Sequence, residues 1–148
     1  MLTLKRKSKT LEFPGRTRKG RPFEVILATL SVFGDIGRKE VSLTEFQESI
    51  AEFQRNFTAL GYAYSPKFCY SLDLLSDLED LVYHGYIHQY QYKYDGFLPN
   101  RYLALTTLGK GRSNKIVELI SEDVLEKLKQ SVTKADQDYK SKWRLWAR

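Results

Sequence analysis

Apolar residues recur every three or four positions along several stretches of this 148-residue chain, which is the period of an amphipathic α-helix. The first stretch begins at Pro22, whose missing amide proton suits a first helical turn, and stops at Gly34. A second stretch follows Ser42, which forms a capping box with Glu45, and Gly61 supplies its stop. The pattern therefore predicts two helices in the first part of the chain.

A third helix is predicted to begin after the capping residue Ser71 and to end at Gly85. Four apolar residues at helical spacing form its expected buried stripe: Leu72, Leu75, Leu78 and Val82. The turn that follows changes the period of the pattern from about 3.6 to about 2, which is the period of a strand.

Two alternating segments, 86–94 and 101–106, are separated by a turn with the sequence Asp95-Gly96 and predict a β-hairpin. A last helical stretch starts near Thr107, and Ser121 can cap a further helix within it. The order of elements is then helix, helix, helix, hairpin, helix. This order defines an α+β fold.

Charge is distributed unevenly along the chain, whose formal net charge is +6. Residues 1–21 hold eight basic side chains and one acidic one, and we interpret them as a flexible basic arm. Residues 22–126 carry a net −6, and residues 127–148 a net +5. We divide the chain into the arm, a globular domain over 22–130 and a basic C-terminal tail over 131–148. The basic ends indicate an anionic partner.

Composition limits the classes of protein further. Hydrophobic residues make up 42 % of the chain, enough for one core and too many for a disordered protein. There is no apolar run long enough to span a membrane and no secretory signal, so we expect a cytoplasmic protein without a membrane role. Cys69 is the only cysteine, which excludes an intramolecular disulfide.

Two short motifs resemble those of the winged helix-turn-helix superfamily. Residues 78–87, LEDLVYHGYI, look like the pattern L-x-x-L-x-x-x-G-φ-φ that joins the third helix to the wing, where φ is apolar or aromatic. Residues 105–109, LTTLG, resemble the pattern L-T-x-x-G that leads into the closing helix. The chain is similar to small prokaryotic winged-helix regulators, and residues 64–66 are similar to antitoxin-like members. The resemblance implies three helices, a two-stranded wing and a C-terminal helix over residues 22–130.

The resemblance also implies that the third helix reads the major groove of DNA. However, residues 71–84 contain no Lys or Arg and carry four acidic side chains, which a phosphate backbone would repel. Asp73, Asp77 and Asp80 share one helical face with His84. This face is either a solvated surface or a docking site for a basic partner.

Nucleic-acid contacts are therefore predicted elsewhere. Gly20-Arg21-Pro22 looks like the core of a minor-groove AT-hook, although Pro22 also fits a helix start. We predict phosphate contacts from the arm and from a second cluster on the wing and the closing helix. The arm residues are Lys5, Arg6, Lys7, Lys9, Arg16, Arg18, Lys19 and Arg21, and the second cluster is Lys93, Arg101, Lys110, Arg112 and Lys115.

Aromatic residues offer further candidate surfaces. Four tyrosines share one face of the first hairpin strand, where they either cover a half-buried sheet or stack unpaired bases: Tyr86, Tyr90, Tyr92 and Tyr94. Trp143 and Trp146 lie in the basic tail and are predicted anchors for a protein partner, with spacing that fits a short amphipathic helix. The apolar stripe of the second helix belongs either to the core or to a dimer interface.

Catalysis is not predicted. His84 and His88 lie four residues apart, but Gly85 ends the helix between them and removes the shared face that metal ligation needs. We therefore predict no metal, no cofactor and no enzymatic activity. The sequence favours a double-stranded DNA-binding transcriptional regulator that acts as a homodimer. The alternatives are a protein-interaction module, such as an antitoxin or an adaptor in a nucleoprotein complex, and a single-strand or RNA binder.

Overall fold

A computed structural model of the chain describes residues 23–56, 60–65, 70–92 and 100–146. Within these residues the fold is α+β, with five helices and a small antiparallel sheet of three strands. The elements in chain order are α2 (Glu24–Asp35), β1 (Val41–Ser42), α3 (Leu43–Asn56), α4 (Leu72–Tyr83), β2 (Ile87–Tyr92), β3 (Asn100–Leu105), α5 (Thr107–Leu119) and α6 (Glu122–Trp146).

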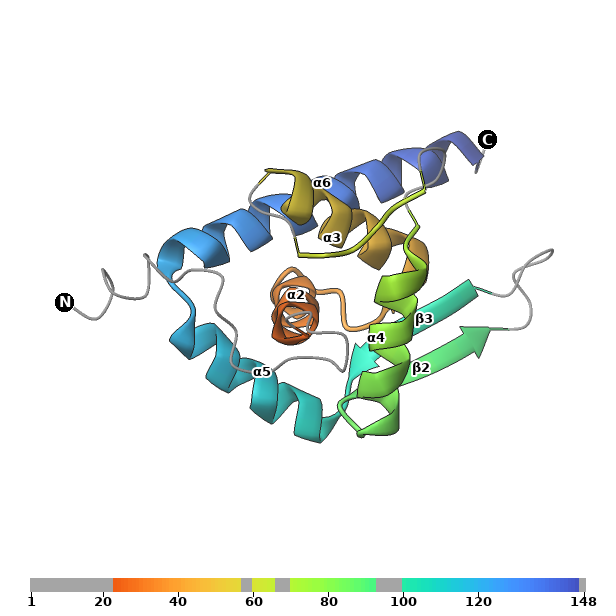
Figure 1. The fold of residues 1–148 in the computed structure, drawn as a ribbon. Helices are drawn as coiled ribbons and strands as arrows, with labels where there is room; N and C mark the ends of the chain where they lie inside the picture. Colours follow the sequence, from red (N-terminus) through yellow and green to blue (C-terminus); the bar gives the residue numbers. More distant parts are fainter. Residues whose placement is uncertain (1–22, 57–59, 66–69, 93–99, 147–148) are drawn as a thin grey trace.

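The helices surround α2, which Figure 1 shows end-on between α3 and α6 on one side and α5 on the other. Nine of the twelve residues of α2 are buried, which explains why this segment is apolar on nearly all of its faces. Phe33 of α2 and Phe46 and Phe53 of α3 are among the largest fully buried side chains of the core. The predicted pair of N-terminal helices is confirmed.

The predicted hairpin is also confirmed, as β2 and β3 pair in an antiparallel register with Ile87 opposite Leu105 and Tyr90 opposite Tyr102. A short strand that the sequence analysis did not predict, β1, pairs with the other edge of β3 through Val41 and Leu103. The sheet order is therefore β1-β3-β2, with β3 in the centre. The turn predicted at Asp95-Gly96 lies outside the described residues.

Local capping sets the start of four helices where the sequence predicts a cap. The hydroxyl oxygens of Ser42, Ser71 and Ser121 accept hydrogen bonds from the backbone amides three residues ahead, at 3.1 to 3.2 Å. Thr106 caps α5 in the same way, accepting from the amide of Gly109 at 2.9 Å. Each hydroxyl satisfies an amide that has no partner within its helix.

The two motifs at residues 78–87 and 105–109 meet in space. Gly85 takes a φ of +83°, which lets the chain leave α4 toward β2. The hydroxyl of Thr106 donates to the carbonyl of Gly85 at 2.6 Å, and the Thr106 amide donates to the carbonyl of Tyr86 at 3.1 Å. A Cβ at Gly109 would collide with the Tyr86 carbonyl. The glycine of the second motif therefore makes room for the backbone of the first.

The buried face of α4 differs from the predicted one. The residues that face the core are Leu74, Asp77, Leu78 and Leu81, whereas Leu72 is 73 % exposed. The helix carries two overlapping apolar stripes of similar spacing, and packing against the core and β2 selects between them. The prediction of a Leu72-Leu75-Leu78-Val82 stripe is wrong in its rotation. The rotation brings Asp77 into the interior.

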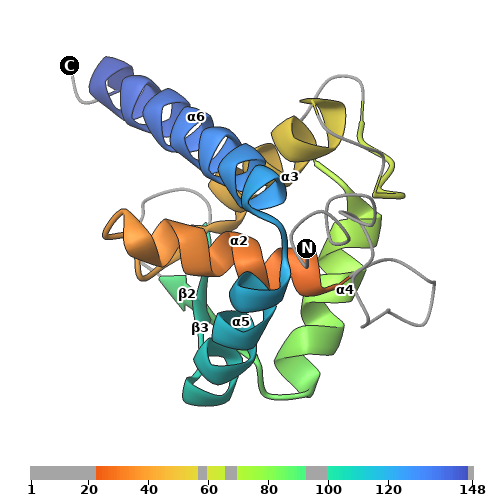
Figure 2. The same ribbon diagram turned by 90° about the vertical axis from the view of Figure 1, so that its left-hand side faces the viewer.

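The helical region at the C-terminus extends past the predicted domain boundary. The helix α6 runs without interruption from Glu122 to Trp146, and Figure 2 shows it lying across α3. Val132 and Ala135 are buried in the core, because apolar residues at helical spacing continue beyond residue 130. The tail that we placed at 131–148 is thus continuous with the globular domain. Among the described residues, no helix has the length and apolar character that a membrane crossing requires.

Candidate functional site

Most of the predicted nucleic-acid contacts lie outside the described residues. These are the arm cations Lys5, Arg6, Lys7, Lys9, Arg16, Arg18, Lys19 and Arg21, together with Lys93, which was predicted on the wing. The backbones of Trp143 and Trp146 belong to the last turns of α6, but the positions of their side chains are not described. The site is therefore built from the remaining candidates, which lie on α4, β3 and α5.

Arg112 of α5 forms an ion pair with a buried carboxylate of α2. Its guanidinium lies 3.2 Å from the carboxylate of Glu24, whose side chain is only 3 % exposed, and it also lies over the ring of Phe23 at 6.0 Å. A buried carboxylate requires such a counter-ion, because burying a charge without a partner is costly. Arg112 thus joins α5 to the start of α2. The Arg112 side chain is still 40 % exposed, so its contact with nucleic acid stays a prediction.

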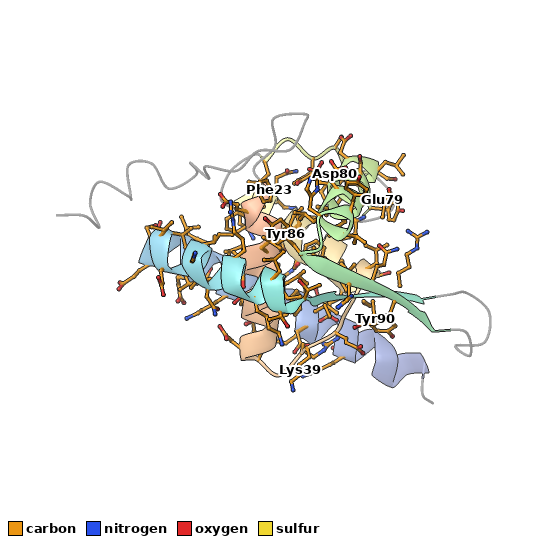
Figure 3. All side chains as sticks on the ribbon, turned by 90° about the horizontal axis from the view of Figure 1, so that it is seen from below. Phe23, Lys39, Glu79, Asp80, Tyr86 and Tyr90 are labelled. Carbon is orange, nitrogen blue, oxygen red and sulfur yellow. The ribbon has the colours of Figure 1, made fainter. Side chains whose placement is uncertain are left out.

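The other described cations of the predicted second cluster do not form one group. Arg101 lies on β3, whereas Lys110 and Lys115 lie on α5, and all three are exposed. Figure 3 shows α5 and the hairpin extending to opposite sides of the junction between them. The chain continues from β3 into α5 without folding back, so these cations are spread along the molecule. The described cations thus lie on two elements, and their contact with nucleic acid stays a prediction.

Asp77 of α4 is buried and hydrogen-bonded. It is 1 % exposed, and its Oδ2 accepts from the Tyr62 hydroxyl at 2.8 Å. The predicted acidic docking face of Asp73, Asp77 and Asp80 is therefore corrected: Asp77 cannot contact a partner, whereas Asp73 and Asp80 are partly exposed. The hydroxyl of Tyr62 supplies the partner that a buried carboxylate needs. Asp77 links α4 to the connector that precedes it.

The exposed side of α4 carries a stripe that the sequence analysis missed. Leu72, Ser76, Glu79 and Tyr83 follow one another at steps of four, three and four, which places them on one helical face. Leu72 is 73 % exposed and Tyr83 is 86 % exposed, and Glu79, which is labelled in Figure 3, lies between them. The spacing was visible in the sequence, but Leu72 had been assigned to the core. We call these four residues the outer stripe of α4.

An ion-pair network ties α3 and α6 to the turn after α2, and the sequence analysis did not predict it. The guanidinium of Arg38 donates to Glu45 of α3 at 2.6 and 3.0 Å and also to Asp136 of α6. Lys140 lies 3.0 Å from the second oxygen of Asp136. The Glu45 side chain is fully buried. The network thus connects residues that lie 98 positions apart.

The pKa values of the two acids in this network shift in opposite directions. Burial raises the pKa of Glu45 to about 7, because loss of hydration outweighs the favourable contact with Arg38. Partial burial works against the charged form of Asp136, but hydrogen bonds from Lys140 and Arg38 outweigh it and lower its pKa. Glu45 consequently holds a proton in the folded protein at mildly acidic pH. The network connects the turn after α2 with α3 and α6.

Metal ligation finds no support in the described part of the chain, where no three His, Cys, Asp or Glu side chains gather around a possible ion site. Cys69 lies outside that part. Comparison with known protein families, characterised proteins and solved structures finds no match to this chain. The fold and the surfaces described above therefore carry what can be inferred of the function.

Proposed function

We propose that this chain is a winged-helix protein that binds double-stranded DNA. The order α2, β1, α3, α4, β2, β3, with β3 between β1 and β2, supports this proposal, since it is the order of a winged helix-turn-helix domain. The hairpin strands β2 and β3 lie beside α4 and point away from α5, as the strands of a wing would (Figure 1). The helix α4 then corresponds to the helix that enters the major groove in such proteins.

The distribution of charge is the observation that carries the mode of binding. No Lys or Arg lies on α4, and Asp73 and Glu79 are at least partly exposed there, so this helix would be repelled from a phosphate backbone. The arm carries +7, and Arg101 is exposed on the wing. Phosphate contacts from the arm and the wing therefore provide the affinity. Such contacts give weak sequence preference unless Arg21 enters an A·T minor groove. Transcriptional control is the role that this reading favours.

Fluorescence anisotropy across a salt series tests this proposal. Labelled duplexes of random and A·T-rich sequence are compared with a single strand of the same length. The full-length chain should prefer duplex, and Arg18→Gln with Arg21→Gln should flatten the slope of log affinity against log salt by about 1.8, at about 0.9 per contact. Tighter binding to the single strand would contradict the proposal and favour a single-strand binder.

A control pair on α6 separates specific contacts from general charge. Lys127→Gln with Lys129→Gln removes the same net charge from a surface that the proposal leaves away from DNA. This pair should leave the slope unchanged. Equal flattening by the two pairs would show that the affinity follows net charge alone.

A second candidate function is docking of a protein partner on α4, and the outer stripe of α4 favours it. Two exposed apolar side chains, Leu72 and Tyr83, flank Glu79, and Asp73 and Asp80 lie beside the stripe. An aromatic anchor beside acidic groups is suited to an apolar protein segment bordered by Lys or Arg. The protein would then act as an adaptor or an antitoxin in a nucleoprotein complex.

Site-specific photo-crosslinking in the source cells tests this second function. A photoreactive phenylalanine analogue replaces Tyr83 in one variant and Leu119 in another, since Leu119 is similarly exposed on α5. A single adduct that forms only at position 83 and disappears with Glu79→Lys supports docking. Identical adducts at both positions contradict it. An adduct near twice the 17.3 kDa mass of the chain identifies a second copy as the occupant and supports the homodimer.

A further inference from the structure

A cleft of about 340 Å³ opens where α2 ends, between α5 and the hairpin. Gly34 and Asp35 of α2 form one wall, Lys110 and Asn114 of α5 form another, and Tyr90 of β2 and the following-turn residue Lys39 lie along its border. Figure 3 views the molecule from this side and labels Tyr90 and Lys39. The cleft lies apart from the outer stripe of α4, which contributes none of its lining residues. Its volume falls within the usual range for small-molecule sites.

Gly34 borders open space at the cleft. A Cβ at Gly34 would meet no atom within 4 Å, although Gly34 lies inside a helix and has no positive φ that would require glycine. Glycine within a helix costs about 1 kcal/mol relative to alanine. The sequence thus keeps a small residue where neither backbone conformation nor packing demands one.

Charged side chains of both signs line the cleft, and two of them are lysines. Lys39 and Lys110 form no ion pair with any residue that the structure describes, and both are exposed. Arg38 also lines the cleft, but Glu45 and Asp136 hold its guanidinium. The carboxylates of Asp35 and Glu40 stand at the same cleft and can accept hydrogen bonds from hydroxyl or amino groups. Two ammonium groups so placed suit a phosphate or a carboxylate.

The remaining lining is suited to a flat apolar group. Leu30 lies one helical turn before Gly34 in α2, and Ala104 and Leu105 of β3 add apolar surface to the cleft that Tyr90 also lines. Tyrosine rings stack favourably on planar rings. We propose that this cleft binds a small aromatic anion, with its phosphate or carboxylate held by Lys39 and Lys110 and its ring placed against Tyr90. This site goes beyond DNA binding and does not depend on it.

Isothermal titration calorimetry on the full-length chain tests the site, with adenosine 5′-monophosphate and 4-hydroxybenzoate as the two probes. Adenosine and 4-hydroxybenzamide serve as neutral counterparts. Binding of either anion, at least tenfold tighter than its neutral counterpart, supports the site and tells whether phosphate or carboxylate is preferred. Absence of binding by both anions at millimolar concentration overturns it.

A substitution that fills the cleft with a larger side chain gives the most direct test of the site. Gly34→Leu should weaken binding of the anion by tenfold or more while the midpoint of thermal unfolding stays equal or rises, because leucine favours the helix. Gly111→Leu is the matched control, since Gly111 lies in α5, lacks any neighbour within 4 Å of a Cβ and does not line the cleft. Equal binding by both variants and the unchanged chain overturns the assignment.

Charge removal tests the role of the two lysines separately. Lys39→Gln with Lys110→Gln should remove the preference for the anion over its neutral counterpart. Retention of that preference would contradict the role of the lysines. Because all of these measurements are made without DNA, their failure leaves the duplex-binding proposal standing, and a failure of duplex binding leaves this site standing.

Discussion

The helices α4 and α5 flank the junction of Gly85 and Thr106 and carry opposite charge. The first has four acidic side chains and no basic one, whereas the second has Lys110, Arg112 and Lys115 against Glu118. In each helix one charged residue has a buried partner: Asp77 accepts a hydrogen bond from Tyr62, and Arg112 pairs with Glu24. The other charged residues of the two helices are partly or fully exposed. The net charge of a helix therefore differs from the charge that its exposed side chains present to a partner.

The same distinction applies to the turn after α2. Arg38 is held between two carboxylates, whereas its neighbour Lys39 borders a cleft. Substitutions of internal charges should therefore change the free energy of unfolding, and those of outward charges should change binding. Four comparisons test this division, in order of decreasing effect on stability.

The largest loss of stability is expected for Arg38→Met. At pH 8 the buried Glu45 would lose its counter-ion, and removal of one partner of a buried pair costs about 3–5 kcal/mol. Urea unfolding followed by circular dichroism measures the change. Arg55→Met is the control, because Arg55 pairs with Glu52 at an exposed position and should cost less than about 1 kcal/mol. Similar losses in both variants would contradict the division.

The pH dependence of stability should change next. The pKa of Glu45 rises from 4.5 to about 7 on folding, so the folded state binds the extra proton between these values. The free energy of unfolding should therefore fall as pH rises from 4.5 to 7, by up to about 3 kcal/mol from this group. Glu45→Gln should remove that fall, and Glu79→Gln should retain it. The lowered pKa of Asp136 acts only at more acidic pH.

Asp77→Ala should destabilise the protein by about 2 kcal/mol, since it leaves the buried Tyr62 hydroxyl without its acceptor. Glu79→Ala, two positions further along the same helix, should change stability by less than about 0.5 kcal/mol because Glu79 is exposed. Thermal unfolding of the two variants side by side measures the difference. An equal effect would place Asp77 at the surface, contrary to its burial.

The smallest effect on stability is expected on α5. Arg112→Met retains an apolar side chain over Phe23 but removes the charge beside Glu24, and we expect a loss of about 1–2 kcal/mol. Lys115→Met should leave stability within about 0.5 kcal/mol. Chemical denaturation of both variants decides the point. An Arg112→Met variant with unchanged stability and weakened duplex binding would show that Arg112 contributes mainly to nucleic-acid binding.

Local features of the fold were predictable from the sequence, because they depend on residues close together in the chain. The caps at Ser42, Ser71, Thr106 and Ser121 and the two strands of the hairpin belong to this group. The choice between two overlapping apolar stripes in α4 was not predictable, since packing against other elements decides it. The rotation of α4 buries Asp77 and exposes Leu72.

Contacts between distant segments were equally hidden. Glu24 and Arg112 lie 88 positions apart, and nothing in the local pattern of either segment indicates the pair. The predictions for the candidate site were the least accurate, because charged residues were assigned to the surface from their sequence spacing alone. The exposed fractions of the side chains and the lining of the cleft beside Gly34 distinguish outward-facing residues from internal ones.

The most direct test of the central claim compares duplex binding by two full-length variants across a salt series. Asp73→Asn with Glu79→Gln removes two of the four negative charges of α4, and Arg18→Gln with Arg21→Gln weakens the arm. If the arm and wing hold the DNA, the α4 variant should bind within about twofold of the unchanged chain, and the slope of the arm variant should be flatter by about 1.8. An α4 variant that binds tenfold tighter, beside an arm variant that binds as before, would show that α4 faces the DNA.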